Sequence, residues 1–353
     1  MGAVDIPRRH PVIAEDLAVI FARDEDWRRF AGCHVLIAGA TSFLAAYLVE
    51  FFASLSERWP EQPVVIHALA RHPEKLRKRF PHLIAQSWFR PIIQDVCDPL
   101  PALERVDFIV HAAGAGSPKQ YLSDPIGTTR SNVLGALNLL ELARQHAARL
   151  LLMSSGAVYG HGESDRPISE TDFGALDPLD ISACYGEGKR VAETLCADYH
   201  RQHGVAAVMA RISHTYGPGI ALDDGRSFAD FVADALAGRD IVLNSDGSGS
   251  RPFCYVSDAT VAFLILLLRG EGGNAYNVGL DQETTILELA RLIARLSPTP
   301  GLQVKHPSPS QERQALFRVG GHFDLAKMER LGWRPSILPE AGFARTLRYF
   351  LQS

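Results

Sequence analysis

The stretch His34-Val-Leu-Ile-Ala38-Gly39-Ala-Thr-Ser-Phe-Leu-Ala45 decides the fold. Its first five residues have the character of a buried strand, and Gly39 follows the strand directly. The apolar residues after the glycine recur at helical spacing, at Leu44, Tyr47, Leu48, Phe51 and Phe52. A strand, a tight turn and a helix in this order form the first unit of a nucleotide-binding α/β domain, in which the free N–H groups at the helix start favour a pyrophosphate.

The turn departs from the glycine pattern G-x-x-G-x-x-G. Gly39, Ser42 and Ala45 occupy its three glycine positions. Ser42 still offers a backbone N–H and a hydroxyl, and Ala45 is small enough for close packing of the helix. The turn therefore remains a candidate cofactor site, beside the alternative of a purely structural connection. The expected contacts are Gly39, Thr41, Ser42, Phe43 and Leu44.

Further strands and helices alternate along the chain up to residue 212. The expected strands cover residues 64–69, 89–94, 108–112, 149–153 and 206–212, and the expected helices cover residues 14–30, 73–80, 128–146 and 185–203. Apolar strands that alternate with helices are typical of a parallel sheet covered on both faces. The expected fold class is therefore α/β, with a doubly wound parallel Rossmann sheet.

The character of the chain changes after Ile212. Glycine and proline become frequent, and the expected elements are helices over residues 227–237, 256–269, 286–296 and 324–331 and a strand over residues 275–279. We interpret this part as a smaller α/β lobe that binds the substrate. The expected organisation is an N-terminal helical extension (1–31), a Rossmann domain (32–212) and a substrate lobe (213–353). Interleaving of the two lobes is left open.

Composition limits the partners that the protein can have. The 353 residues carry a formal net charge of −4 without a long basic run, which argues against nucleic acid. The longest apolar run, residues 261–268, is far shorter than the roughly 20 residues that span a bilayer, and the N-terminus is too charged for a signal peptide. The five scattered cysteines have neither metal-ligand nor disulfide spacing. We expect a cytoplasmic protein without a bound metal and without a membrane or nucleic-acid partner.

A tyrosine and a lysine four residues apart begin the helix expected over residues 185–203, in Cys184-Tyr185-Gly-Glu-Gly-Lys189. On a helix this spacing places both side chains on one face, so that the ammonium lies near the phenol and stabilises the phenolate. Such a pair can remove a proton from a sugar hydroxyl while a nicotinamide takes the hydride. For an isolated match, a surface Tyr/Lys pair is the plain alternative.

Residues at other strand ends add to this interpretation. Ser155 ends a buried strand ahead of Tyr185, at the sheet edge where ligands of parallel sheets bind, and it can bond the same hydroxyl. Arg71 stands at the end of the second strand, where an NAD site has a carboxylate, so that NAD and NADP both stay open. Asp95 and Val96 follow the third strand, where an acid can accept a hydrogen bond from the adenine amino group.

Several motifs together resemble one enzyme family. They are Cys184-Tyr-Gly-Glu-Gly-Lys-Arg-Val-Ala-Glu-Thr194, Asp224-Gly-Arg226 and Arg251-Pro-Phe-Cys-Tyr-Val-Ser-Asp258. Through them, residues 32–350 resemble the extended short-chain dehydrogenases/reductases, also called NAD-dependent epimerases/dehydratases, and most of all the UDP-glucuronate decarboxylases (UDP-xylose synthases) among them. The resemblance implies a nucleotide-sugar substrate, NAD or NADP as cofactor, and a homodimer formed by the helices over residues 128–146 and 185–203.

The resemblance also implies roles for individual residues. Tyr185 would be the catalytic base, Lys189 would bind the nicotinamide ribose and tune Tyr185, and Ser155 would share the substrate proton. Arg251 would grip the nucleotide diphosphate. The other implied contacts are Asn132, Ala112 and Ala113 for the cofactor and Arg226, Tyr255 and His214 for the substrate. Lys119 could pair with a sugar carboxylate, and a solvated loop lysine and a structural His214 are the alternatives.

One departure from the family bears on the reaction. By the resemblance, the decarboxylases carry a glutamate where this chain has Ala157, and the 4,6-dehydratases carry an Asp-Glu pair in place of Gly156 and Ala157. The 4-epimerases work with a small, uncharged segment like this one. We therefore expect an epimerase that oxidises C4 of the sugar transiently. A decarboxylase is the alternative, because a β-keto acid can lose CO2 without a side-chain acid, and a degenerate protein that only binds a nucleotide sugar or dinucleotide is the third hypothesis.

Overall fold

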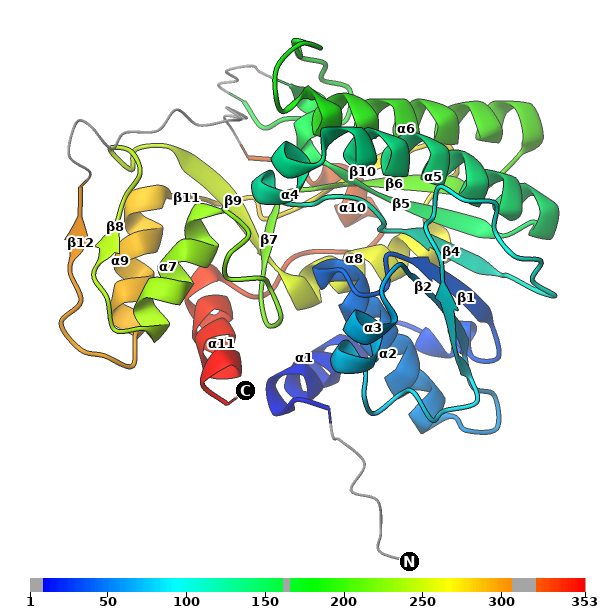
Figure 1. The fold of residues 1–353 in the computed structure, drawn as a ribbon, viewed down its shortest axis with the longest axis horizontal. Helices are drawn as coiled ribbons and strands as arrows, with labels where there is room; N and C mark the ends of the chain where they lie inside the picture. Colours follow the sequence, from blue (N-terminus) through cyan, green and yellow to red (C-terminus); the bar gives the residue numbers. More distant parts are fainter. Residues whose placement is uncertain (1–8, 161–165, 307–321, 353) are drawn as a thin grey trace, which may run out of the picture.

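Seven parallel strands form the central sheet of the computed structural model, which describes residues 9–160, 166–306 and 322–352 (Figure 1). Their order is β10-β6-β5-β4-β1-β2-β3. The strands are β1 (His34–Ala38), β2 (Val65–Ala70), β3 (Phe89–Ile93), β4 (Phe108–His111), β5 (Arg149–Ser155), β6 (Ala207–Ile212) and β10 (Ala275–Val278). The predicted doubly wound α/β fold is confirmed.

Helices cover both faces of this sheet. Alternate side chains of a strand point to opposite faces, and Leu36 and Leu150 accordingly pack in one apolar cluster while Val35 and Leu151 pack in another. The first cluster is covered by α5 (Pro125–His146) and α6 (Ala183–His203), and the second by α2 (Phe43–Arg58) and α8 (Val256–Arg269) (Figure 1). The near-continuous apolar strands are therefore explained by burial on both sides.

A smaller lobe interleaves with the sheet. It contains a three-stranded sheet of β7 (His214–Tyr216), β9 (Ser250–Tyr255) and β11 (Glu283–Thr285), and a two-stranded sheet of β8 (Ile241–Val242) and β12 (Val304–Lys305). Its helices are α7 (Ser227–Leu236), α9 (Ile286–Leu296) and α11 (Pro339–Leu351). Between these elements the chain returns to the large sheet with α8 and β10, and α10 (Ala326–Arg330) packs on β10. Residues beyond 212 thus complete the Rossmann sheet.

The N-terminal extension does not form the single helix predicted over residues 14–30. The helix α1 (Pro11–Phe21) ends before the charged run of residues 23–26, and a 3-10 turn, Trp27–Phe30, follows. Four consecutive charged side chains offer no apolar group for packing, whereas Trp27 and Phe30 are buried against the core. Apolar burial therefore decides where the helix ends.

Asp16 of α1 joins both lobes and the C-terminal helix. It is fully buried, and its carboxylate accepts hydrogen bonds from the hydroxyls of Tyr47 on α2 at 2.9 Å and of Tyr255 on β9 at 2.8 Å. Arg345 of α11 donates to the same carboxylate at 2.8 Å. Burial raises the pKa of Asp16, and these three donors oppose the rise.

Asp16→Ala is expected to destabilise the fold by about 3 kcal/mol, because it leaves two buried hydroxyls and a guanidinium without their acceptor. Denaturant unfolding, followed by fluorescence, measures the change. Glu15→Ala is the matched control, since Glu15 pairs with Arg348 at the surface and a much smaller effect is expected. Equal losses of stability in the two variants would contradict the stabilising role of the buried Asp16 carboxylate.

Candidate active site

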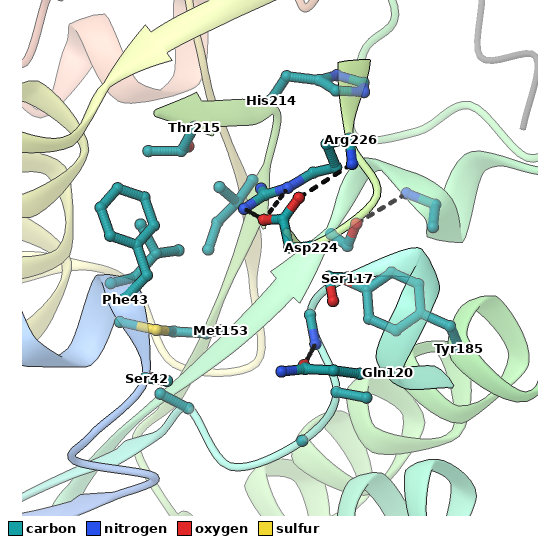
Figure 2. Close-up of a pocket in the computed structure, with 18 of the residues that line it drawn as sticks. Ser42, Phe43, Ser117, Gln120, Met153, Tyr185, His214, Thr215, Asp224 and Arg226 are labelled. Carbon is teal, nitrogen blue, oxygen red and sulfur yellow. Dashed lines mark hydrogen bonds and ion pairs between the residues drawn. The ribbon is translucent and has the colours of Figure 1, made fainter. Parts of the chain in front are cut away.

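A cavity of about 440 Å³ opens at the carboxyl edge of the large sheet, where the two lobes meet (Figure 2). It is lined by the turn after β1, the loop after β4, the end of β5, the start of α6, and residues of β7 and β9. Its volume lies in the range of small-molecule sites. Ligands of open parallel sheets bind at this edge, so that the cavity is the candidate active site.

The turn after β1 closes tightly on the end of β4. Gly39 has φ +78°, and a Cβ at this position would lie 2.6 Å from the carbonyl oxygen of Ala112 and 2.7 Å from the N atom of Ala113. Neither the backbone angle nor the space allows a side chain here. Ala45, by contrast, fits fully buried at the third glycine position. The absence of the later glycines thus leaves the turn intact.

The turn presents an anion-binding helix start to the cavity. Ser42 is the N-cap of α2, and its side chain makes no capping hydrogen bond, so the first N–H groups of the helix stay available to a ligand. Thr41, Ser42, Phe43 and Leu44 line the cavity on this side, and Ala112 and Ala113 line it beside the turn. This cradle fits the pyrophosphate of a dinucleotide.

The ends of β2 and β3 carry the predicted adenosine contacts. Arg71 and Asp95 approach each other, with Nη1 3.8 Å from Oδ2, and both are well exposed. Burial raises the pKa of Asp95, but a backbone hydrogen bond from Cys97 and the charge of Arg71 outweigh it, and the pKa is lowered overall. Val96 is buried against α5. The lining of the 440 Å³ cavity does not include Arg71, Asp95 or Val96. They follow β2 and β3, on the side of β1 away from β4 in the sheet.

Ser155, Tyr185 and Lys189 meet at the wall of the cavity. Ser155 ends β5 close enough to the phenol of Tyr185, in the first turn of α6, to lower the pKa of that phenol. Lys189 follows one turn later, is 6% exposed, and donates from Nζ to the carbonyl oxygen of Met153 at 2.7 Å. The structure therefore brings the three predicted catalytic residues together.

The pKa values of Tyr185 and Lys189 differ in one respect from the prediction that Lys189 lowers the pKa of Tyr185. Burial raises the pKa of the Tyr185 phenol, and the hydrogen bond from Ser155 and the charge of Arg226 oppose the rise. Lys189, expected to lower this pKa, is not among the groups that shift it, and its ammonium donates instead to the Met153 carbonyl. Burial also lowers the pKa of Lys189 to about 8.

Tyr121 is a neighbour that the sequence did not reveal. It lies on α4 (Pro118–Ser123), is 3% exposed, and its ring stacks on that of Tyr185 with centroids 5.3 Å apart and 15° between the planes. The stacked ring restricts the Tyr185 side chain to one orientation and excludes water from one face of it. No periodicity marks a six-residue helix in a loop, so only a contact in space could identify this residue.

The opposite end of the cavity is positively charged. Arg226 and Arg251 line it. Arg226 donates from Nε to Asp224 at 2.8 Å (Figure 2). His214 lies at this end as well; burial and the two nearby arginines 251 and 226 lower its pKa to about 3, so that it is neutral. Guanidinium groups beside a neutral imidazole suit a diphosphate.

The floor between the two ends is uncharged. Gly156 and Ala157 line it, and a Cβ on Gly156 would lie 2.7 Å from the ring of Phe323. Among the lining residues that the structure describes, the one carboxylate is that of Asp224, which is bound to Arg226. Position 157 therefore has no substitute acid from another element in this lining.

Comparisons with known proteins agree with this site. The sequence model described as "NAD dependent epimerase/dehydratase family" matches residues 35–279, more than half of the chain. The chain belongs to this family. The expected cofactor, NAD, is the one that the family description names, and the predicted family resemblance is confirmed.

The chain is also similar to individual relatives and to solved structures. It is 38% identical over 306 residues to "UDP-glucuronic acid decarboxylase 3" of Arabidopsis thaliana, which covers 86% of this chain and 84% of the relative. The dTDP-glucose 4,6-dehydratase of Streptomyces venezuelae, solved with NAD, has a TM-score of 0.77 at 24% identity and covers 90% of this chain and 97% of its own. The UDP-glucuronic acid 4-epimerase of Bacillus cereus, solved with UDP-glucuronic acid and NAD, has a TM-score of 0.75 at 19% identity, covering 90% and 99%. These two structures share the fold.

Three predicted contacts of this family member lie away from the cavity. Tyr255 is fully buried and bonded to Asp16; an extended strand places it about 13 Å along β9 from Arg251, inside the core. Asn132 is also fully buried, donates to the Thr128 carbonyl at 3.0 Å and packs against Gly188 of α6 behind the cavity wall. Neither side chain lines the cavity, and the predicted ligand contacts of Tyr255 and Asn132 stay predictions.

Lys119 is the third of these residues. Its ammonium lies 2.7 Å from Asp223 on the exposed surface and does not line the cavity, although its neighbours Pro118 and Gln120 do. Helix α4 turns these neighbours inward and Lys119 outward. The predicted pairing with a sugar carboxylate is therefore not supported by the geometry.

Lys119→Ala is accordingly expected to change KM for the sugar nucleotide by less than about threefold, because an exposed ion pair contributes little. Arg226→Ala, at the charged end of the cavity, should raise KM by more than about tenfold, since it removes a charge-assisted contact. Steady-state kinetics of the two variants measures both. A larger effect at Lys119 than at Arg226 would contradict this placement.

None of the helices in the described part of the chain has both the length and the hydrophobicity to cross a membrane.

Proposed function

We propose that this chain is an NAD-dependent UDP-glucuronate decarboxylase that oxidises C4 of the sugar transiently and releases the C6 carboxyl group as CO2, leaving a UDP-pentose. The observation that carries the proposal is the 38% identity to a UDP-glucuronic acid decarboxylase over 86% of a chain whose cavity retains Ser155, Tyr185 and Lys189. The charged end with Arg226 and Arg251 supports a nucleotide diphosphate in the same cavity.

The side chains have distinct tasks in this reaction. Tyr185 accepts the proton of the C4 hydroxyl, and Ser155 shares the hydrogen bond. We infer that Lys189, one helical turn after Tyr185, supplies a positive charge that favours the phenolate in the reacting enzyme. The turn from Thr41 to Leu44 would hold the pyrophosphate of NAD, and bound NAD would accept the C4 hydride and later return it.

Loss of CO2 does not need an acid at position 157. Once C4 is a ketone, the C6 carboxylate lies β to it, so the C5–C6 bond can break with its electron pair passing to the C4 oxygen. The Tyr185 phenol and the Ser155 hydroxyl are placed to stabilise this enolate oxygen. C5 then takes a proton from water, and the ketone is restored. Ala157 removes one source of acceleration while leaving the pathway open.

A 4-epimerase is the second candidate, and the uncharged pair Gly156 and Ala157 favours it. In that case the ketone is reduced again from its other face, and C6 keeps its carboxylate. A third candidate is a protein that binds the sugar nucleotide or NAD without turnover, for which the missing glycines at positions 42 and 45 argue. The intact turn at Gly39 speaks against this candidate.

NAD is preferred over NADP in this proposal. Asp95 lies beside Arg71, the one residue that the sequence offered for a 2′-phosphate, and its carboxylate would repel such a phosphate. Equilibrium titration of the purified chain with NADH and NADPH tests the preference, with tighter NADH binding expected.

The deciding experiment is incubation with UDP-glucuronate carrying ¹³C at C6, followed by NMR. Appearance of labelled CO2 together with a UDP-pentose supports the decarboxylase. Labelled UDP-galacturonate without CO2 would establish the epimerase instead. Absence of both products, with NAD and substrate bound, would leave only the binding role.

We also propose that the protein is a homodimer. Helices α5 and α6 pack side by side, and Ile126, Leu134 and Val191 on them are exposed apolar residues. A second copy of the same helix pair would cover these side chains. Small-angle X-ray scattering at several concentrations tests the proposal, and a monomer at all of them would refute it.

A further inference from the structure

A buried ion pair lies behind the proposed catalytic residues. Glu193 of α6 and Arg211 of β6 are each 8% exposed, with the Arg211 Nη2 2.7 Å and Nε 3.1 Å from the Glu193 oxygens Oε2 and Oε1. Arg211 also lies over the ring of Tyr159 and donates to the carbonyl of Glu170 at 2.9 Å. Neither Glu193 nor Arg211 lines the cavity, so contact with a ligand does not explain the pair.

Glu193 connects the two elements that carry the proposed catalytic groups. The hydroxyl of Ser154 donates to its carboxylate at 2.6 Å. Ser154 stands on β5 between Met153, whose carbonyl accepts the hydrogen bond from Lys189, and Ser155. The Glu193 carboxylate on α6 thus holds the end of β5 at Ser154, which lies between the Lys189 acceptor Met153 and Ser155.

Glu193 also acts on the charge of Lys189. It follows Lys189 by four residues on α6, which places both side chains on one face of the helix. Burial lowers the pKa of Lys189 to about 8, and the negative charge of Glu193 opposes that fall. The other titratable groups facing the ammonium are neutral, because burial raises the pKa of the Cys196 thiol on α6 and lowers that of His111 on β4 to about 3.

We propose that Glu193 is a positioning residue of this site: its buried carboxylate keeps Lys189 positively charged at neutral pH and fixes the helix of Tyr185 against the end of β5. Arg211 makes the direct ion pair with this carboxylate, whereas Glu193 acts on Lys189 through its charge without an ion pair between the two. The catalytic part of this inference rests on the proposed function, whereas the charge of Lys189 can be measured without turnover.

Glu193→Gln tests the proposal, because it keeps the shape of the side chain and an acceptor for Ser154 but removes the charge. The Lys189 titration is followed by NMR of the full-length chain with ¹³C-labelled lysine and is assigned by its loss in Lys189→Arg. We expect its midpoint to fall by about one pH unit or more. A lysine is charged below its pKa, so the alkaline limb of kcat/KM should move to lower pH as well, with KM nearly unchanged.

Two further variants separate charge from structure. Ser154→Ala removes the hydrogen bond and keeps the carboxylate, so it should lower kcat without moving the Lys189 midpoint. Arg211→Gln removes the ion-pair partner of the Glu193 carboxylate and also removes a cation near Lys189. Both changes should raise the midpoint of the Lys189 titration. This second variant keeps the proposal testable if Glu193→Gln does not fold.

The outcomes are distinct from those of the proposed function. An unchanged Lys189 midpoint in Glu193→Gln, or a lowered midpoint in Arg211→Gln, overturns the role of Glu193. So does a loss of activity that is uniform across pH. If the wild type leaves UDP-glucuronate unconverted, the proposed function fails, and a shifted midpoint still supports the electrostatic role of Glu193.

Discussion

Tyr185→Phe is expected to lower kcat by about 10³-fold, because general acid–base catalysis by a positioned side chain contributes on the order of 10²–10⁴. The substitution removes the phenolic oxygen and leaves the ring stacked on Tyr121. Affinity for NAD should stay within a few-fold, since the substitution leaves the turn at Gly39 and the start of α2 unchanged. Single-turnover kinetics with UDP-glucuronate, together with an NAD titration, measures both quantities.

Tyr121→Phe is the matched control for this experiment. It keeps the stacked pair of rings and the Tyr185 hydroxyl, so we expect kcat to fall by less than about tenfold. A Tyr185→Phe enzyme that retains more than a tenth of wild-type kcat would exclude Tyr185 as the proton acceptor. The opposite order of the two effects would assign the chemistry to Tyr121.

Gly39→Ala is expected to abolish NAD binding and to destabilise the protein by more than about 2 kcal/mol. The new Cβ would meet the Ala112 carbonyl oxygen at 2.6 Å, and φ +78° is strained for alanine in any case. Backbone atoms on both sides would have to separate, which opens the turn that presents the start of α2. Denaturant unfolding and isothermal titration with NAD measure the two effects.

Gly204→Ala is the control that separates the cost of the positive φ angle from the cost of the steric clash at Gly39. Gly204 has φ +69°, close to that of Gly39, but a Cβ there would meet nothing within 4 Å. We expect this control to lose only about 1 kcal/mol from the unfavourable backbone angle and to bind NAD normally. Equal losses at the two glycines would mean that the close approach to Ala112 is unimportant.

Much of the fold could be predicted from the sequence because the strands are buried on both sides. Runs such as residues 150–153 carry apolar side chains at every position, and the helices between them have caps or apolar periodicity. The bounds of α8, Val256–Arg269, and α9, Ile286–Leu296, were predicted correctly for this reason. Short elements without such periodicity, β7, β9 and α4, escaped prediction.

The site residues whose positions follow from local spacing in the sequence could be predicted. Those whose positions depend on tertiary contacts could not. Tyr185 and Lys189 share a helix turn, and Ser155 ends a strand at the ligand edge, so the sequence alone could bring them together. Tyr255 looked equivalent to Arg251 within one motif. Its position at the far end of β9 places it instead on Asp16, a partner 239 residues away that no local pattern indicates.

The return of the chain to the large sheet constrains how this protein can be made. Strand β10 pairs with β6 only after the segment that contains β7, β9 and α8 has been synthesised, so the large sheet gains this edge strand late in synthesis. On the ribosome, the seven-stranded sheet cannot be completed before residue 278, the last residue of β10, has emerged. The two lobes are therefore expected to unfold in one cooperative transition, and a lesion in the sugar-binding half should weaken the dinucleotide half equally.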